Sequence, residues 1–194
     1  MRAKVLISVE IADSSKTVFT DRYVLESPEA IDSVQDDFYE ILRVQLNPGK
    51  YSLKINLLDI NKEDSEISGV LPISIEDFST NTKISDVLVA EYAYPSDQQT
   101  NFDKSGYHII PMLSSFYGTD SKTLPVYFEL YGTEKIKDST FQLSHRIINM
   151  KDASEMPGFT RTSTLFKSSV VPVFETINIE DLNSGNYQIE YRLT

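Results

Sequence analysis

An alternation of apolar and polar side chains with a period of two runs through almost the whole chain and limits what it can fold into. Segments such as KVLISVEI (residues 4–11) and YSLKINLLDI (residues 51–60) follow this pattern and are rich in β-branched residues. Short clusters of Asp, Asn, Ser, Pro and Gly separate such segments. The pattern places one face of an extended strand in a core and the other in water, which is typical of antiparallel sheets. We therefore predict an all-β protein.

The same pattern recurs in both halves of the chain. The further predicted strands are TVFTDRYVLE, YEILRVQL, GVLPISI and ISDVLVAEY in the first half, and YHIIPMLSSFYG, LPVYFELYG, TFQLSHRIIN, TRTSTLFKSS, VPVFETINI and YQIEYRLT in the second. About six or seven short strands per half, with regular turn signals, favour a β-sandwich. One helix candidate remains at residues 27–38, where Ser27 can act as N-cap and Pro28 can occupy the first helical position. A plain acidic loop fits this segment equally well.

One short motif occurs twice in the sequence. LNPGKYSLKI at residues 46–55 returns as LNSGNYQIEY at residues 182–191, with Leu, Gly and Tyr kept. Pro48 fixes its own φ and Gly49 can adopt a positive φ, so the motif predicts a tight turn that opens a new strand. A chance recurrence of a hairpin signal is the simplest alternative.

The tyrosines of the two copies, Tyr51 and Tyr187, suggest a more specific role. In immunoglobulin-like sandwiches a tyrosine at a corner between strands lays its ring on the core and donates a hydrogen bond to the backbone a few residues upstream. Leu46 would be the buried residue before that turn. We therefore predict that both tyrosines are structural corner residues.

The repeat and a polar stretch near the middle of the chain indicate two domains. The stretch YPSDQQTNFD, residues 94–103, contains a proline and few apolar residues, as expected of a linker. We predict two tandem antiparallel β-sandwiches of the immunoglobulin-like or fibronectin III-like type, with borders at residues 1–96 and 97–194.

Charge and composition exclude several classes of function. The 194 residues carry a net charge of -11, and no basic cluster is available to neutralise phosphates, so nucleic acid is a poor candidate partner. No apolar run approaches the roughly 20 residues that span a bilayer, so we expect no direct membrane insertion. The chain has no cysteine, which removes disulfides, thiolate metal sites and cysteine nucleophiles.

Candidate metal ligands are few. The segment DINKEDSE, residues 59–66, spaces the oxygen ligands Asp59, Asn61 and Glu63 like the start of a calcium loop. Asp64 stands where such a loop needs glycine. A solvated hairpin loop explains the segment better, and we expect no bound metal.

Candidate catalytic residues are equally sparse. His108 and His145 stand far apart in the sequence without a second ligand or nucleophile at a suitable spacing, and a single strand histidine is usually a surface or packed residue. Asp36 and Asp37 are adjacent, and neighbours in a strand point to opposite faces. The sequence also lacks a nucleophile elbow and a phosphate loop. We expect no catalytic residues, no cofactor and no enzymatic activity.

Four segments together resemble a known family. VQLNPGKYSLKINLLDI, TKISDVLVAEY, GYHIIPMLSS and LPVYFELYG are similar to the paired immunoglobulin-like N-terminal region of bacterial envelope proteins named for a downstream GWxTD domain. The resemblance covers about residues 4–194 through loose strand motifs, and the GWxTD signature is absent from this sequence. It implies an exported protein of the periplasm or cell surface, of which this chain would be a trimmed piece.

Taken together, these features predict a non-enzymatic interaction or spacer module that binds a protein partner in the cell envelope. The alternative is an accessory carbohydrate-binding module of a polysaccharide-active enzyme, since the chain contains eleven Tyr and ten Phe residues. Tryptophan, which often stacks on sugars, is absent. Strand aromatics also serve as core residues and as cross-strand pairs, so aromatic content does not decide between the two functions.

Overall fold

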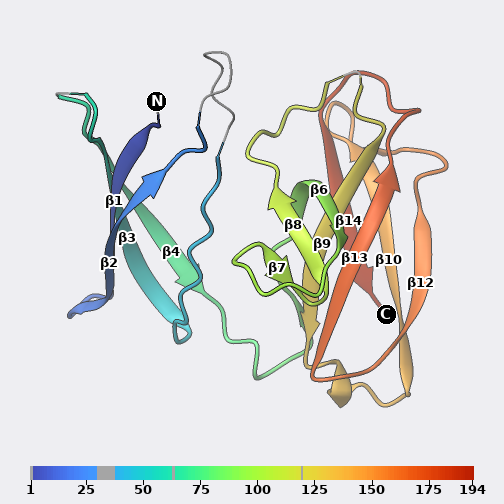
Figure 1. The fold of residues 1–194 in the computed structure, drawn as a ribbon. Helices are drawn as coiled ribbons and strands as arrows, with labels where there is room; N and C mark the ends of the chain where they lie inside the picture. The colour runs from blue at the N-terminus through green and yellow to red at the C-terminus, as the bar shows by residue number, and fades with distance from the viewer. Residues whose placement is uncertain (1, 30–37, 63, 119) are drawn as a thin grey trace. The chain divides into compact units, whose positions relative to one another are not determined.

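The structure is a computed structural model that describes residues 2–29, 38–62, 64–118 and 120–194 (Figure 1). These residues form antiparallel sheets, and the only helical element among them is the short 3-10 helix η1 (Thr133–Lys135). The prediction of an all-β protein is thereby confirmed. Most of the helix candidate at residues 27–38 lies outside the described residues.

The chain divides into two compact units, Met1–Asp77 and Phe78–Thr194. The described strands of the first unit are β1 (Lys4–Ala12), β2 (Thr17–Glu26), β3 (Gly49–Asp59) and β4 (Ile67–Ile75). They form one sheet in the order β2-β1-β3-β4. The alternating sequence gives this sheet an apolar face, on which Val9 lies beside Ile55 and Ile11 beside Leu53. Val9 and Ile11 of the central strand β1 are buried, whereas most of β4 at the edge is exposed.

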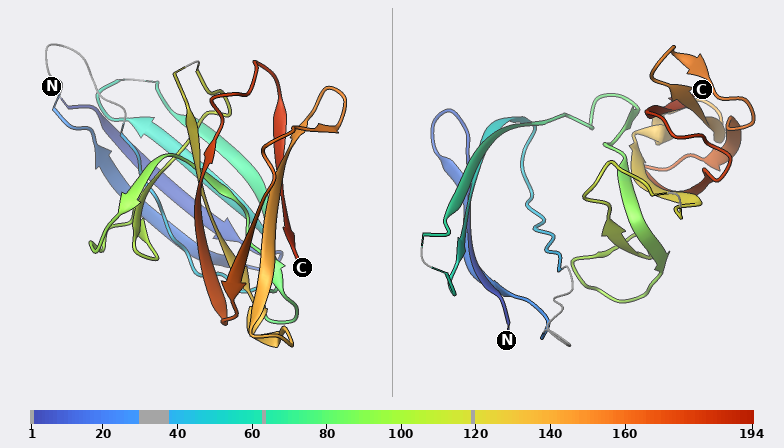
Figure 2. Two further views of the ribbon diagram at one scale, coloured as in Figure 1. Left: turned by 90° about the vertical axis from the view of Figure 1, so that its right-hand side faces the viewer. Right: turned by 90° about the horizontal axis from the view of Figure 1, so that it is seen from above.

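The segment between β2 and β3 departs from the prediction. YEILRVQL, residues 39–46, was expected to be a strand, but it is assigned to no strand in the structure. In Figure 2 the chain around residues 38–48 runs opposite the concave side of the sheet, and Ile41, Val44 and Leu46 are half-buried. Its alternating pattern therefore reflects contact on one side without the ladder of hydrogen bonds that defines a strand.

The second unit contains two sheets. Its described strands are β5 (Lys83–Ile84), β6 (Leu88–Pro95), β7 (Asp103–Lys104), β8 (Tyr107–Pro111), β9 (Thr123–Tyr131), β10 (Thr140–Asn149), β11 (Ser154–Glu155), β12 (Arg161–Phe166), β13 (Val170–Asn178) and β14 (Tyr187–Leu193). One sheet has the order β13-β9-β6-β8-β7, with β5 also paired to β9, and the other joins β11, β12 and β14 to β10.

The apolar core of the second unit lies between its two sheets, as in a β-sandwich. One cluster contains Val126 of β9, Ile147 of β10 and Ile177 of β13, and a second contains Phe128 of β9 and Phe141 of β10. Each cluster draws side chains from both sheets, so their burial holds the sheets together. The more specific prediction, a tandem pair of immunoglobulin-like sandwiches, stays a prediction.

The border between the units differs from the predicted one at residues 96 and 97. Strand β6 pairs with β9 at Leu88 and Val89 and with β8 farther along, so it belongs to the second unit. The predicted linker at residues 94–103 instead connects β6 with β7. There Ser96 N–H donates to the Gly106 carbonyl at 2.9 Å. A hairpin loop and a linker have the same polar composition, which is why the sequence of residues 94–103 was interpreted as a linker.

Both predicted corner tyrosines make the expected contact. The Tyr51 hydroxyl donates to the Asn47 carbonyl at 2.9 Å, and the Tyr187 hydroxyl donates to the Asn183 carbonyl at the same distance. Tyr187 also packs against the core cluster around Ile147. The hydroxyl contacts predicted for the two tyrosines are confirmed, and the two copies of the motif share this local geometry, while the wider corner role stays a prediction.

The glycines of the motif have a different role from the one expected. Neither Gly49 nor Gly185 adopts a positive φ. Instead, a Cβ atom at Gly49 would lie 3.4 Å from the Tyr51 hydroxyl oxygen, and one at Gly185 would lie 3.2 Å from that of Tyr187. A methyl group at Gly185 would therefore crowd the Tyr187 ring, which folds back over the backbone, whereas at Gly49 it would only reach ordinary contact distance from the Tyr51 ring.

Replacement of Tyr187 by Phe should lower the free energy of unfolding by about 0.5–1.5 kcal/mol, the net value of one hydrogen bond. Gly185→Ala should also destabilise the protein, because the added methyl group crowds the tyrosine ring. Gly69→Ala is the control, since no atom lies within 4 Å of the added Cβ there. Denaturant unfolding measures all three, and equal stabilities for wild type, Tyr187→Phe and Gly185→Ala would contradict the corner assignment.

The border between the units can be tested with fragments. Residues 78–194 retain β5 and β6 and should unfold in one cooperative thermal transition. Residues 97–194 lack both strands, which leaves β9 without two of its partners, and should show no such transition. Circular dichroism on heating measures this, and cooperative unfolding of the shorter fragment would restore the border predicted from the sequence.

Candidate functional site

A histidine, a glutamate and a tyrosine form a polar cluster inside the sandwich of the second unit. His145 of β10 has a side chain only 3% exposed, and its Nδ1 lies 2.9 Å from Oε2 of Glu175 on β13. Tyr191 of β14 donates its hydroxyl to the same oxygen at 3.1 Å. Because β10 and β13 belong to different sheets, this His145 cluster joins the two layers.

The alternation of each strand places these groups in the core. Along β10, His145 follows Leu143 and precedes Ile147 on the buried face, and Glu175 precedes the buried Ile177 on β13. The sequence predicts His145 to be a surface or packed residue, and the structure shows a packed one. Its partners Glu175 and Tyr191 could not be predicted from the sequence, because they are far from His145 along the chain and only the packing of the sheets brings them together.

Burial and hydrogen bonding act in opposite directions on Glu175. Burial raises the pKa of its carboxyl group, but the hydrogen bond and charge of His145 and the hydrogen bond from Tyr191 outweigh it, so the pKa lies below the usual 4.5. Burial also raises the pKa of the Tyr191 hydroxyl, and the nearby Glu175 raises it further. The cluster thus favours a carboxylate that accepts hydrogen bonds, which suits a structural tie between sheets.

The second histidine takes part in a separate cluster. His108 of β8 places Nδ1 3.2 Å from Oδ1 of Asp103 on the neighbouring strand β7. Its ring stacks on Tyr94 and also contacts Phe102. Hydrogen bonds from Thr100 depress the pKa of Asp103 most strongly, with a further contribution from His108. The two histidines share no partner, so the structure does not bring them into one site.

A third polar cluster surrounds Glu129 on β9. Its buried carboxylate accepts hydrogen bonds from the hydroxyls of Tyr127, at 2.6 Å, and Tyr131, and Lys104 contributes an ion pair at 3.1 Å. Burial raises the pKa of the Glu129 carboxyl group, but these hydrogen bonds and the charge of Lys104 outweigh it, so the pKa is lowered. The stretch YFELY could have indicated this cluster, since it places Tyr, Glu and Tyr on one face of a strand and Phe and Leu on the other.

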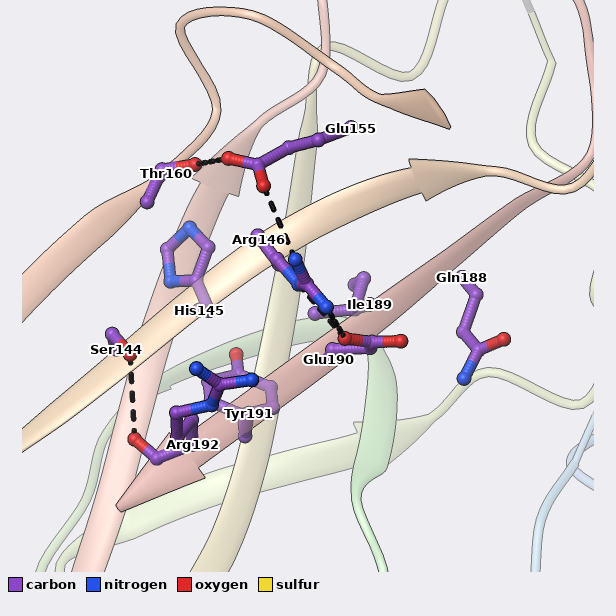
Figure 3. Close-up of a pocket in the computed structure, with 10 residues that line it drawn as sticks. All are labelled: Ser144, His145, Arg146, Glu155, Thr160, Gln188, Ile189, Glu190, Tyr191 and Arg192. Carbon is purple, nitrogen blue, oxygen red and sulfur yellow. Dashed lines mark hydrogen bonds and ion pairs between the residues drawn. The ribbon is translucent and has the colours of Figure 1, made fainter. Parts of the chain in front are cut away.

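The outer face of β10 and β14 carries a polar pocket of about 460 Å³ (Figure 3). Arg146 on its floor contacts Oε2 of Glu190 through Nη2 at 2.6 Å and Glu155 at 3.3 Å. Thr160 donates its hydroxyl to Glu155 at 2.5 Å. The hydrogen bond from Thr160, followed by that from Arg146, lowers the pKa of Glu155. A carboxylate with a lowered pKa is a poor general base, so the pair of Thr160 and Glu155 is ill suited to activate a nucleophile.

The other sequence candidates do not add to a site. Asp36, Asp37 and Glu63 lie outside the described residues. Asp59 accepts a hydrogen bond from the Asn61 backbone N–H at 2.9 Å, which is a common arrangement in a turn. Within the described part of the chain, no group of three or more His, Asp or Glu residues is arranged to hold a metal ion.

Comparison with known proteins gives no family for this chain. No family model matches it, and no curated protein matches it. In the part of the chain that the structure describes, there is also no helix of sufficient length and hydrophobicity to cross a membrane. The surfaces and side-chain clusters of the chain itself are therefore the basis on which its function is inferred.

Replacement of Glu175 by Gln should lower the free energy of unfolding at pH 7 by about 1–3 kcal/mol, as expected for hydrogen bonds to a charged group. The depressed pKa of Glu175 means that its stabilisation is present above about pH 4.5 and is lost as the pH falls through the folded-state value. Stability should consequently fall less steeply with acid in Glu175→Gln than in wild type.

The matched control is Glu180→Gln, which removes an exposed ion pair with Lys122. Its effect should stay within about 0.5 kcal/mol. Urea unfolding between pH 3 and pH 7 measures all three proteins. Equal effects of the two substitutions, with parallel pH profiles, would show that the His145 cluster does not stabilise the sandwich.

Proposed function

We propose that the chain is a non-enzymatic interaction module, and that its first unit binds an extended segment of a protein partner along strand β4. The observation that carries this proposal is the exposure of this edge strand. All six residues from Ile67 to Pro72 are exposed, including Ile67 at 68%, Val70 at 63% and Leu71 at 56%. Large apolar side chains at a sheet edge are a liability unless a partner covers them.

The position of β4 supports binding by strand addition. β4 is the last strand in the order β2-β1-β3-β4, so one side of its backbone has no partner strand among the described residues. An extended peptide can pair with such an edge, and alternate side chains then contact the two faces of the sheet. Pro72, which lacks an N–H, restricts this pairing to the part from Ile67 to Leu71.

Charge narrows the kind of partner. Residues 1–77 contain 8 Lys or Arg and 15 Asp or Glu residues, which gives a net charge of -7. A basic or neutral partner segment suits this surface, and salt should slow association with a basic one. Location in a bacterial cell envelope, either in the periplasm or at the cell surface, is a proposal that rests on the family resemblance alone.

The polar clusters of the second unit support a role without catalysis. The carboxylates of Glu175 and Glu129 are engaged by hydrogen-bond donors, and both have lowered pKa values. In the described residues, no buried side-chain nitrogen or oxygen lacks a hydrogen-bond partner. Polar groups whose hydrogen bonds are already made stabilise the fold and are less available to react. This suits a spacer that carries the binding unit.

A charge placed on β4 should weaken partner binding. Val70→Lys introduces an ammonium group at the proposed contact and should weaken capture of the partner by roughly tenfold or more. The measurement is an affinity pull-down from bacterial envelope extract at low and high salt, followed by titration of the captured protein. Wild-type capture should fall at high salt if the partner is basic.

The matched control is Val24→Lys on β2, the opposite edge of the same sheet, where Val24 is 45% exposed. This variant adds the same charge to the same unit and should bind as wild type does. Equal binding by Val70→Lys and wild type would contradict the proposed contact. Turnover of a substrate by the purified chain would contradict the non-enzymatic role.

A further inference from the structure

We propose that the second unit binds a neutral oligosaccharide on an aromatic surface formed by Tyr92, Tyr94 and His108. This goes beyond the proposed protein contact, because it concerns the other unit and another class of ligand. Tyr92 and Tyr94 are 50% and 49% exposed and lie on the same face of β6, two residues apart. Their ring centroids are 6.5 Å apart and their planes differ by only 7°.

The neighbouring strand holds this surface in place. His108 of β8 lies directly opposite Tyr94 in the register of β6 and β8. Their rings stack with centroids 4.9 Å apart, and Phe102 packs on the His108 ring at 5.7 Å. Asp103 fixes the His108 ring through Nδ1. The exposed rings are therefore preorganised, so a ligand would lose little free energy in ordering them.

The sheet leaves one side of these tyrosines open. β6 pairs with β9 only at Leu88 and Val89, and from Ala90 onward its described pairing is with β8 alone. The two tyrosine rings thus stay half exposed although they stand in a strand of a packed sheet. Two rigid, parallel aromatic rings at such a position form a flat apolar surface with polar edges.

A sugar matches this combination of groups. The C–H face of a pyranose ring can stack on a tyrosine ring while its hydroxyl groups bond to polar groups at the edge. Among the described residues, neither the Tyr92 nor the Tyr94 hydroxyl has a hydrogen-bond partner, so both can donate to and accept from a ligand. The rings of two consecutive sugar units could be placed on two consecutive tyrosines.

The acidic residues close to the aromatic surface in the sequence favour neutral sugars over acidic ones. Glu91 and Asp97 flank the two tyrosines in the sequence, Asp103 is paired with His108, and Lys104 is paired with the buried Glu129. A uronic acid would meet carboxylates of its own sign. A proline-rich peptide is the other ligand that aromatic rows bind, but it docks into slots between rings. Here His108 stacks on Tyr94, so the space between these two rings is filled and cannot serve as such a slot.

Titration calorimetry with the full chain tests the proposal. The probes are cellohexaose, xylohexaose and mannohexaose, with a trigalacturonate and a decaproline peptide as the competing ligand classes. At least one neutral hexasaccharide should bind, and Tyr92→Ala and Tyr94→Ala should each weaken that binding about tenfold or more. Tyr94→Phe keeps the stacked ring and should retain most of the affinity.

Phe166→Ala is the matched control, because Phe166 is an aromatic residue of the same unit that is 77% exposed and lies outside the stacked group. It should bind as wild type does, and thermal unfolding should show that every variant is folded. Absence of binding by all three neutral hexasaccharides would overturn the proposal. Binding that survives in the Tyr92→Ala, Tyr94→Ala double variant, or binding of decaproline or trigalacturonate alone, would overturn it as well.

Discussion

The hydrogen-bonded pair of His145 and Glu175 is the interaction on which the second unit depends. It connects β10 of one sheet with β13 of the other, and it separates the apolar cluster around Ile147 from the cluster around Phe128. The Glu175 side chain is only 22% exposed, and a largely buried carboxylate is costly without a partner, so an alignment of the sheets that brings His145 to Glu175 is favoured. A shift of β10 by one residue would turn His145 outward and leave Glu175 with only the hydroxyl of Tyr191. We therefore expect the pair to favour one packing of the sandwich as well as to stabilise it.

The first unit has fewer buried contacts than the second unit. Its described strands form a single sheet, and the segment at residues 38–48 that faces the sheet is not paired as a strand. Only Val9 and Ile11 among its apolar strand residues are buried, and β4 remains exposed at the edge. A sheet of this kind can gain free energy from an added strand, whereas the core of the second unit is already covered by its two sheets. This contrast is why the protein contact is placed on the first unit and the rigid aromatic surface on the second.

Local patterns in the sequence were sufficient for part of this structure. Alternation predicted the all-β fold, and the repeated motif predicted the hydroxyl contacts of Tyr51 and Tyr187, because both depend on residues close in the chain. The role of Gly185 was missed, since the need for glycine comes from the ring of Tyr187 and not from φ. The domain border was also misplaced, because a polar hairpin loop and a linker have the same composition.

Long-range partners could not be read from the sequence. Glu175 follows His145 by thirty residues, and Lys104 precedes Glu129 by twenty-five, so only the folded sheets show that each pair is in contact. The stacking of Tyr94 on His108 likewise depends on the register of β6 and β8. The exposure of β4 was hidden for the same reason. Its sequence, ISGVLPISI, has enough apolar residues for a covered strand, although Pro72 is typical of an edge strand, and the strand order shows that it forms an edge.

The most direct test of the account is site-specific photocrosslinking from β4, combined with hydrogen exchange. A photoreactive amino acid in place of Val70 should form a covalent adduct with one protein in bacterial cells, and the same group in place of Val24 should not. With that protein purified, the backbone amides from Ile67 to Leu71 should become protected from exchange when the two are mixed. Equal adducts at both positions, or no protection of those amides in the complex, would contradict the claim that β4 is the binding edge.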